Sequence, residues 1–178
     1  MRNLRTFLNA TIVCATLLIS QSAIAQKINQ KSTSVIINGT SSLHDWEMTG
    51  SSATFSGTVN GTAISNATFS IPVKNLSSTK GKMMNNKAYA ALKADKAPNI
   101  TFTATSIPVG KSNLNGKMTI AGVSKNVTFP VTVVKNANTY TINGTETLKL
   151  SDFGMERPGF MGVKTGDVVT VKVNIVAE

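Results

Sequence analysis

Regular alternation of apolar and hydroxyl residues is the feature that most constrains how this chain can fold. Between Ala53 and Val59 every odd position is apolar or small and every even position carries a hydroxyl. The same alternation recurs in residues 67–73, 100–104, 127–133, 140–144 and 169–175. A period of two places successive side chains on opposite faces of a strand, so each segment predicts a strand with one buried face.

Short connections between these segments favour antiparallel pairing. Residues 34–38, 46–49 and 114–121 bring the predicted strands to about eight or nine. Turn-forming residues separate most of them: Asn60-Gly61, Asn115-Gly116, Gly122, Asn136 to Asn138 and Gly166-Asp167. Such an all-β chain can pack as a sandwich or close into a barrel, and periodicity does not choose between them. Closure would remove exposed strand edges.

One segment, from Gly81 to Ala97, has helical rather than strand character. Met84, Ala88, Ala91 and Leu92 fall on one stripe at helical spacing, and Pro98 follows the segment. We predict a short amphipathic helix between two strands. It would either plug one end of the sheet structure or pack outside it.

Residues 1–25 have the features of a signal peptide. Arg2 and Arg5 precede an apolar stretch from Leu8 to Ile19, and Ala23-Ile24-Ala25 supplies the small-residue cleavage pattern. Cys14 raises the possibility of lipoprotein processing, but Val13 is a poor match for the small residue that this processing prefers. We therefore expect export to the periplasm or beyond, with cleavage after Ala25 and one mature domain spanning residues 26–178.

The mature chain would be basic and free of cysteine. Removing Arg2 and Arg5 leaves 16 Lys and Arg against 8 acidic residues, a net charge of +8, and removes Cys14 from the chain. Disulfides and thiol chemistry are then excluded. The lysines are scattered, and Arg157 is the one remaining arginine, which disfavours nucleic acid as a partner. Transient contact with an anionic membrane surface stays open.

Residues that could carry catalysis are sparse. His44 is the only histidine, so a zinc site is improbable, and Ser41 and Ser42 nearby lack a nucleophile-elbow motif. No phosphate-binding or dinucleotide motif is present. We predict no catalytic residues, no metal and no cofactor, with His44 and Asp45 bonded within a turn and Trp46 closing one end of the core.

A loop near the C-terminus interrupts the alternation. The glycine-rich segment from Ser151 to Gly162 exposes apolar side chains and either folds back over the core or guards an opening. Glu146, Asp152 and Glu156 form the nearest acidic grouping, which Lys149 or Arg157 could neutralise. We expect that grouping to be structural.

Three stretches, in this order, resemble the YceI-like family of exported lipid- or polyisoprenoid-binding proteins. They are Lys96 to Phe102, with its Pro-x-Ile-x-Phe strand entry, the hairpin from Gly116 to Val127, and Ser151-Asp152-Phe153-Gly154 before the last strand. The chain departs from the family pattern at Leu150, where an arginine is common, and at Met84-Asn85, where Arg-Asp is common.

The resemblance implies an eight-stranded antiparallel lipocalin-like barrel with one short helix, and an apolar tunnel for a polyisoprenoid, quinone or similar long chain. It also allows a homodimer. Inward positions of the strands and of the predicted opening give the expected ligand-binding residues. These are Phe55, Val59, Phe69, Ile71, Met84, Leu92, Phe102, Met118, Ile120, Phe129, Val131, Ile142, Leu148, Phe153, Phe160, Val171 and Val173.

Two other functions compete with a lipid carrier. The same barrel with a packed interior could be a structural or interaction module that works through its basic surface. An enzyme would depend on His44.

Overall fold

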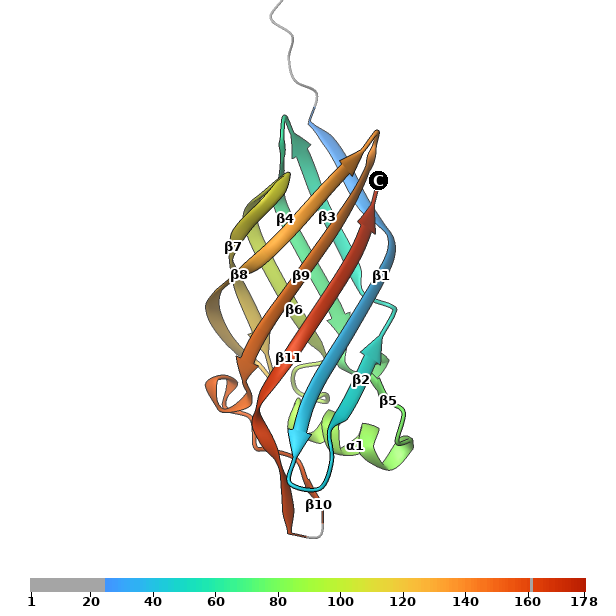
Figure 1. Cartoon of the computed structure of the whole chain (residues 1–178), viewed down its shortest axis with the longest axis vertical. Coiled ribbons are helices and arrows are strands. Elements are labelled where there is room, and N and C mark those ends of the chain that lie inside the picture. Colours follow the sequence, from blue (N-terminus) through green and yellow to red (C-terminus); the bar gives the residue numbers. More distant parts are fainter. Residues whose placement is uncertain (1–24, 161) are drawn as a thin grey trace, which may run out of the picture.

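Eight long antiparallel strands close into a barrel in the computed structural model, which describes residues 25–160 and 162–178 (Figure 1). Their bounds are β1 (Gln26–Ser41), β3 (Thr54–Asn60), β4 (Ala63–Pro72), β6 (Asn99–Pro108), β7 (Gly110–Ile120), β8 (Val123–Asn136), β9 (Thr139–Lys149) and β11 (Val163–Ala177). Each strand pairs with the next in this order, and β11 pairs back with β1 from Gln30↔Ala177 to Ser41↔Thr165. The predicted barrel is therefore confirmed, and the sandwich is wrong.

Shorter elements gather at the lower end of the barrel as drawn in Figure 1. They are β2 (Trp46–Gly50), the 3-10 turn η1 (Val73–Asn75), β5 (Ser77–Ser78), α1 (Lys82–Ala91), the 3-10 turn η2 (Leu150–Phe153) and β10 (Gly159–Phe160). The strand β1 is long enough to pair with β3 through Gln26–Asn29 and with β2 through Val35–Gly39. Together β2 and β3 act as one interrupted strand beside β1.

Two of the predicted turns are wrong. Asn115-Gly116 lies within β7 and Gly166-Asp167 within β11. Both glycines serve a close approach rather than a reversal: a Cβ on Gly116 would lie 2.2 Å from the Phe102 ring, and one on Gly166 would lie 2.7 Å from the Thr40 hydroxyl. The predicted turns at Gly61, Gly122 and Ala137-Asn138 are present.

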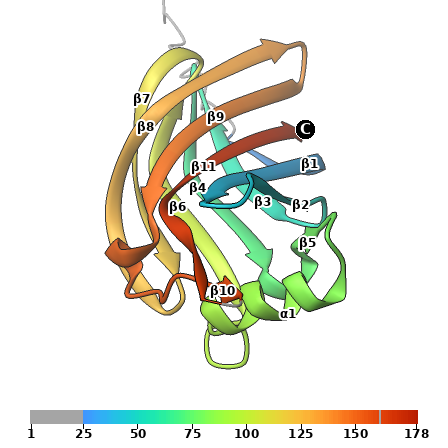
Figure 2. The same cartoon turned by 60° about the horizontal axis from the view of Figure 1, so that its bottom comes forward.

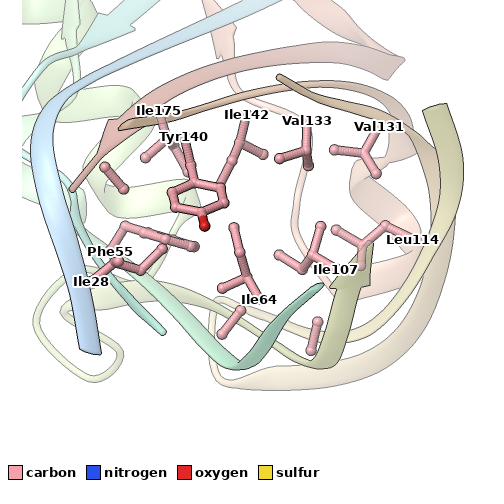
Figure 3. Packing of buried hydrophobic residues seen from close by; sticks show 13 residues of the cluster. Ile28, Phe55, Ile64, Ile107, Leu114, Val131, Val133, Tyr140, Ile142 and Ile175 are labelled. Atoms are coloured by element: carbon pink, nitrogen blue, oxygen red, sulfur yellow. The ribbon is translucent and has the colours of Figure 1, made fainter. Parts of the chain in front are cut away.

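The upper end of the barrel is packed with side chains (Figure 3). Residues from all eight wall strands meet there, with exposed fractions of 5 % or less. They are Ile28, Phe55, Ile64, Ala67, Ala104, Ile107, Leu114, Val131, Val133, Tyr140, Ile142, Ile175 and Ala177. We call this set the far-end cluster. Burial of these apolar side chains stabilises the closed end.

The helix α1 lies across the other end of the barrel, as the view in Figure 2 shows. It ends at Ala91 rather than at Ala97, because Leu92 caps it and Lys93 adopts a left-handed φ of 54°. Ala88 and Ala91 of α1, with Leu92, contact the barrel interior. The helix therefore plugs one end of the barrel, the first of the two predicted arrangements. In the described residues, no helix has the length and hydrophobicity needed to cross a membrane.

Candidate functional site

Between the far-end cluster and α1 the barrel encloses a cavity of about 180 Å³. Its lining is apolar, and Lys149 is the one charged residue that contributes to it in the described chain. Fourteen of the predicted ligand-binding residues line it: Phe55, Phe69, Ile71, Leu92, Phe102, Met118, Ile120, Phe129, Val131, Ile142, Leu148, Phe153, Val171 and Val173. The inward faces of strands far apart in the sequence thus meet around one space.

Three predicted residues do not line this cavity. Val59 packs against the far-end cluster, because β3 carries it into the packed end of the barrel. Met84 lines the separate hollow beside α1, about one turn of the helix before Ala88, the first residue of α1 that lines the cavity. The side chain of Phe160 lies outside the described part of the structure.

Several lining residues were absent from the prediction. Val169 and Ile175 continue the inward alternation of Val171 and Val173 on β11, so that alternation could have identified them. Val35 and Ile37 lie in a Val-Ile-Ile run that is apolar on both faces, which hides the inward set. The other apolar lining residues that the prediction missed are Trp46, Met48, Ala67, Leu76, Ala88, Ala91, Ile100, Ile107, Leu114, Leu150, Met155 and Pro158.

Two phenylalanines form the boundary between the packed end and the cavity. The ring centroids of Phe102 and Phe129 are 5.4 Å apart with an interplanar angle of 56°, an arrangement that aromatic pairs favour. Gly116 leaves room for the Phe102 ring, and a Cβ on Gly144 would lie 3.2 Å from the Phe129 ring. Both rings are half-buried, line the cavity and pack against the far-end cluster.

Trp46 forms part of the opposite boundary. Its indole N–H donates to the Thr40 carbonyl oxygen at 3.1 Å, and its ring covers Gly39, where a Cβ would lie 2.2 Å from the ring. Beyond Trp46 lies a second hollow of about 130 Å³, which we call the mouth pocket. Trp46, Met48, Ala88 and Pro158 line both spaces, so the mouth pocket leads toward the cavity.

The comparison with family models settles what kind of barrel this is. The YceI-like domain model matches residues 26–177. The chain belongs to the YceI-like family. The three resembling stretches lie at the entry to β6, in the β7–β8 hairpin and in η2.

Solved structures share the YceI-like barrel with this chain. BcnA from Burkholderia cenocepacia is 26 % identical, with a TM-score of 0.69 over 82 % of this chain and 96 % of its own. A polyisoprenoid-binding domain from Saccharophagus degradans is 12 % identical, with a TM-score of 0.69 over 85 % and 97 %. A YceI protein from Campylobacter jejuni is 21 % identical, with a TM-score of 0.51 over 64 % and 71 %. No curated protein matches the chain.

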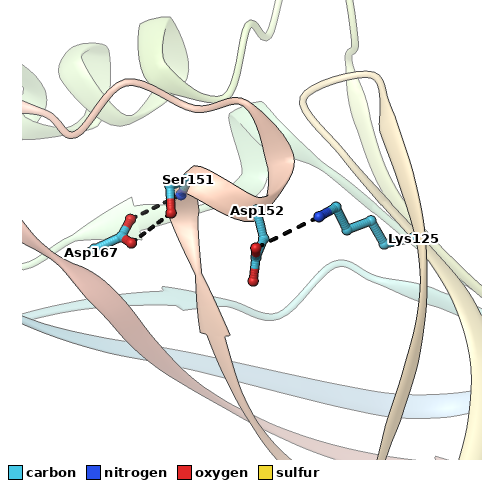
Figure 4. A network of polar contacts seen from close by, with 4 residues as sticks. All are labelled: Lys125, Ser151, Asp152 and Asp167. Atoms are coloured by element: carbon cyan, nitrogen blue, oxygen red, sulfur yellow. Dashed lines mark hydrogen bonds and ion pairs between the residues drawn. The ribbon is translucent and has the colours of Figure 1, made fainter.

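One group of polar contacts in this YceI-like barrel lies at η2, on the rim of the cavity (Figure 4). The Ser151 hydroxyl and backbone N–H donate to the two carboxylate oxygens of Asp167 at 2.6 and 2.9 Å. These hydrogen bonds, aided by the positive charges of Arg157 and Lys149, lower the pKa of Asp167. Lys125 lies 3.6 Å from Asp152. The prediction that Lys149 or Arg157 would neutralise Asp152 is therefore wrong, because the β7–β8 hairpin brings Lys125 closer.

The other acidic residue near this rim is isolated. Glu146 lies on the inner face of β9, and burial raises the pKa of its carboxyl, partly offset by a hydrogen bond from the Thr147 backbone N–H. It makes no ion pair within the described residues. The predicted neutralisation of Glu146 by Lys149 or Arg157 is therefore not seen among the ion pairs of the described residues.

His44 lies in the exposed connection between β1 and β2. Its Nδ1 is 3.0 Å from the Asp45 carbonyl oxygen, and the Ser41 hydroxyl donates to the His44 carbonyl oxygen at 2.8 Å. Across residues 25–160 and 162–178, no three His, Cys, Asp or Glu side chains group closely enough to hold a metal ion. The bonds around His44 are those of a turn.

Proposed function

We propose that this protein binds a long apolar lipid, a polyisoprenoid or quinone-like chain, inside the barrel and carries or stores it after export to the periplasm. The observation that carries the proposal is the enclosed cavity, whose lining comes from apolar side chains of every wall strand. The YceI-like domain is a binding fold without known enzymatic activity. The same fold in Saccharophagus degradans is described as polyisoprenoid-binding.

The length of the lipid's hydrocarbon chain makes its binding favourable. Each methylene-sized group removed from water contributes about 0.8 kcal/mol, so tens of carbons can offset the entropy lost on ordering the chain. The lining needs no polar partner for such a ligand. We therefore infer a binding protein that needs no metal or cofactor.

The interior must widen to hold a long chain. A volume of about 180 Å³ is close to the roughly 150 Å³ that accommodates a benzene-sized guest, and below the roughly 300–1,000 Å³ of common ligand sites. Met48, Met118 and Met155 line the cavity, and their unbranched side chains can change rotamer at low cost. We expect the bound form to have a larger cavity.

The end of the barrel that carries the mouth pocket suits transient contact with an anionic membrane surface. Leu43 and Met83 are 71 % and 53 % exposed near this end, and Lys80 and Lys87 line the mouth pocket. Apolar side chains flanked by lysines are typical of surfaces that rest on lipid headgroups. A homodimer remains a prediction.

Native mass spectrometry tests the proposed function. The mature protein, purified from its own periplasm without detergent, should carry a stoichiometric mass that extracts as an isoprenoid or other long apolar chain. A bare protein mass under several growth conditions would instead favour the packed interaction module, whose partner binding should weaken with added salt.

A cavity-filling variant links the lipid to the interior. Val171→Phe extends a side chain into the cavity and should reduce the retained lipid at least about tenfold. Val168→Phe makes the same change on the same strand at a side chain that is 46 % exposed, and should retain the lipid. Equal retention by both folded variants would place the lipid elsewhere.

A further inference from the structure

One carboxylate belongs to the inner face of this apolar barrel. The inward positions of β9 run Ile142, Gly144, Glu146 and Leu148, and the other three of these line the cavity. Across the ladder Glu146 pairs with Val171 of β11, which also lines the cavity. Paired residues in an antiparallel ladder carry their side chains on the same face, so Glu146 lies on the inner face between residues that line the cavity, although its own side chain is not one of them.

Glu146 lies just beyond the point where the pairing between β8 and β9 ends. The pairing of β8 with β9 runs from Asn136↔Thr139 to Val131↔Gly144 and stops there. The next residue of β8 is Pro130, which has no N–H to donate to a ladder. Farther down, β8 pairs with β7 and β9 pairs with β11. Within the described strands, Glu146 therefore has a ladder partner on one side.

The cations of this region act on carboxylates other than Glu146. Lys125 occupies an inward position of β8, opposite Met118, and its ammonium pairs with Asp152 at 3.6 Å. Lys149 and Arg157 act on Asp167, whose pKa they help to lower. The causes of the raised pKa of Glu146 include no neighbouring cation. Within the described residues Glu146 thus has no ion-pair partner.

We propose that Glu146 receives the polar end of the bound lipid and selects lipids that end in an uncharged hydrogen-bond donor, such as an alcohol, over lipids that end in a carboxylate or a phosphate. This inference rests on the proposed function. A carboxylate accepts hydrogen bonds and cannot donate them when ionised, so a hydroxyl is a matched partner. A lipid carboxylate or phosphate beside the half-buried Glu146 carboxylate would be repelled by it and poorly solvated.

A competition between two lipids that share the same isoprenoid chain and differ in the end group tests the inference. The delipidated full-length mature protein is mixed at pH 7.5 with equal amounts of geranylgeraniol and geranylgeranoic acid, and native mass spectrometry gives the ratio bound. The wild-type protein should prefer the alcohol by at least about tenfold, because the acid carries a second negative charge. Glu146→Gln should reduce this preference to within about threefold by improving retention of the acid.

Glu47→Gln is the matched control, since it removes the same charge from an exposed residue of β2 whose carboxylate accepts a hydrogen bond from Asn38. It should keep the wild-type preference. An unchanged preference in Glu146→Gln, or an equal change in both variants, overturns the inference and leaves lipid binding standing. Retention of neither lipid by any of the three proteins overturns the proposed function, and the inference with it.

Thermal unfolding checks that Glu146→Gln is folded. Burial raises the pKa of Glu146, so the folded state disfavours its ionised form. The stability from the protonated form is present below the ordinary glutamic acid pKa of about 4.3 and is lost as the pH rises through the raised value. The variant should therefore be at least as stable as the wild type at pH 7.5.

Discussion

Trp46 is the residue that connects the cavity with its surroundings, because its ring lines both the cavity and the mouth pocket. Its position depends on Gly39, the neighbour across the β1–β2 ladder. The indole is also the only one in the chain, so its fluorescence reports on this boundary alone. The sequence predicted the role of Trp46, whereas the glycine beneath it could be recognised only once the two strands were paired.

Gly39→Ala should displace the indole. The added Cβ would lie 2.2 Å from the ring, and such overpacking typically costs about 1–3 kcal/mol. We expect lower stability and red-shifted tryptophan emission. Asn38→Ala, which removes only an exposed hydrogen bond to Glu47, should change neither appreciably. Unaltered emission in Gly39→Ala would show that the ring does not rest on this glycine.

At the scale of elements, η2 is the structure that the sequence described least well. It predicted a glycine-rich loop that either folds back over the core or guards an opening, and the structure shows a 3-10 turn whose Phe153 is 2 % exposed and lines the cavity, as in the first alternative. The bonds that hold η2 come from β8 and β11. Pairings between such distant segments leave no local pattern in the sequence.

Ser151→Ala should loosen η2 in a pH-dependent way. Hydrogen bonds from Ser151 lower the pKa of Asp167, so they stabilise the fold above the ordinary aspartic acid pKa of about 3.9 and lose this effect as the pH falls through the lowered value. The variant should melt below the wild type at pH 7, and the difference should shrink in acid. Ser42→Ala, at an exposed serine between β1 and β2, should show no such trend. A difference that is constant with pH would contradict this account.

On the scale of the whole molecule, the barrel is divided into a solid end and a hollow end. The far-end cluster supplies packing, and the cavity between it and α1 supplies the site. Truncation of a side chain and binding of a ligand should therefore have different effects at the two ends. Lipid that fills the hollow end should raise the unfolding temperature by mass action.

Truncating one isoleucine at each end tests this division. Ile64→Ala removes a side chain with 0 % exposure in the far-end cluster and should cost about 2–5 kcal/mol of unfolding free energy. Ile37→Ala acts on a half-buried side chain at the cavity wall and should cost less in the lipid-free protein, because fewer contacts are lost. Chemical denaturation of both variants gives the comparison. Equal costs would mean that the interior is packed uniformly.

The sequence by itself determined that the chain is built of strands with one apolar face, and alternation identified part of the cavity lining. Only the tertiary structure decided that β1 and β11 join to close the wall, that Val59 lies in the solid end, and that β8 separates from β9 beside Glu146. The physical reason is that a period of two fixes the face on which a side chain lies, but not its height along the barrel. Whether the interior is filled or hollow at a given height depends on side-chain volumes from strands that are distant in the sequence.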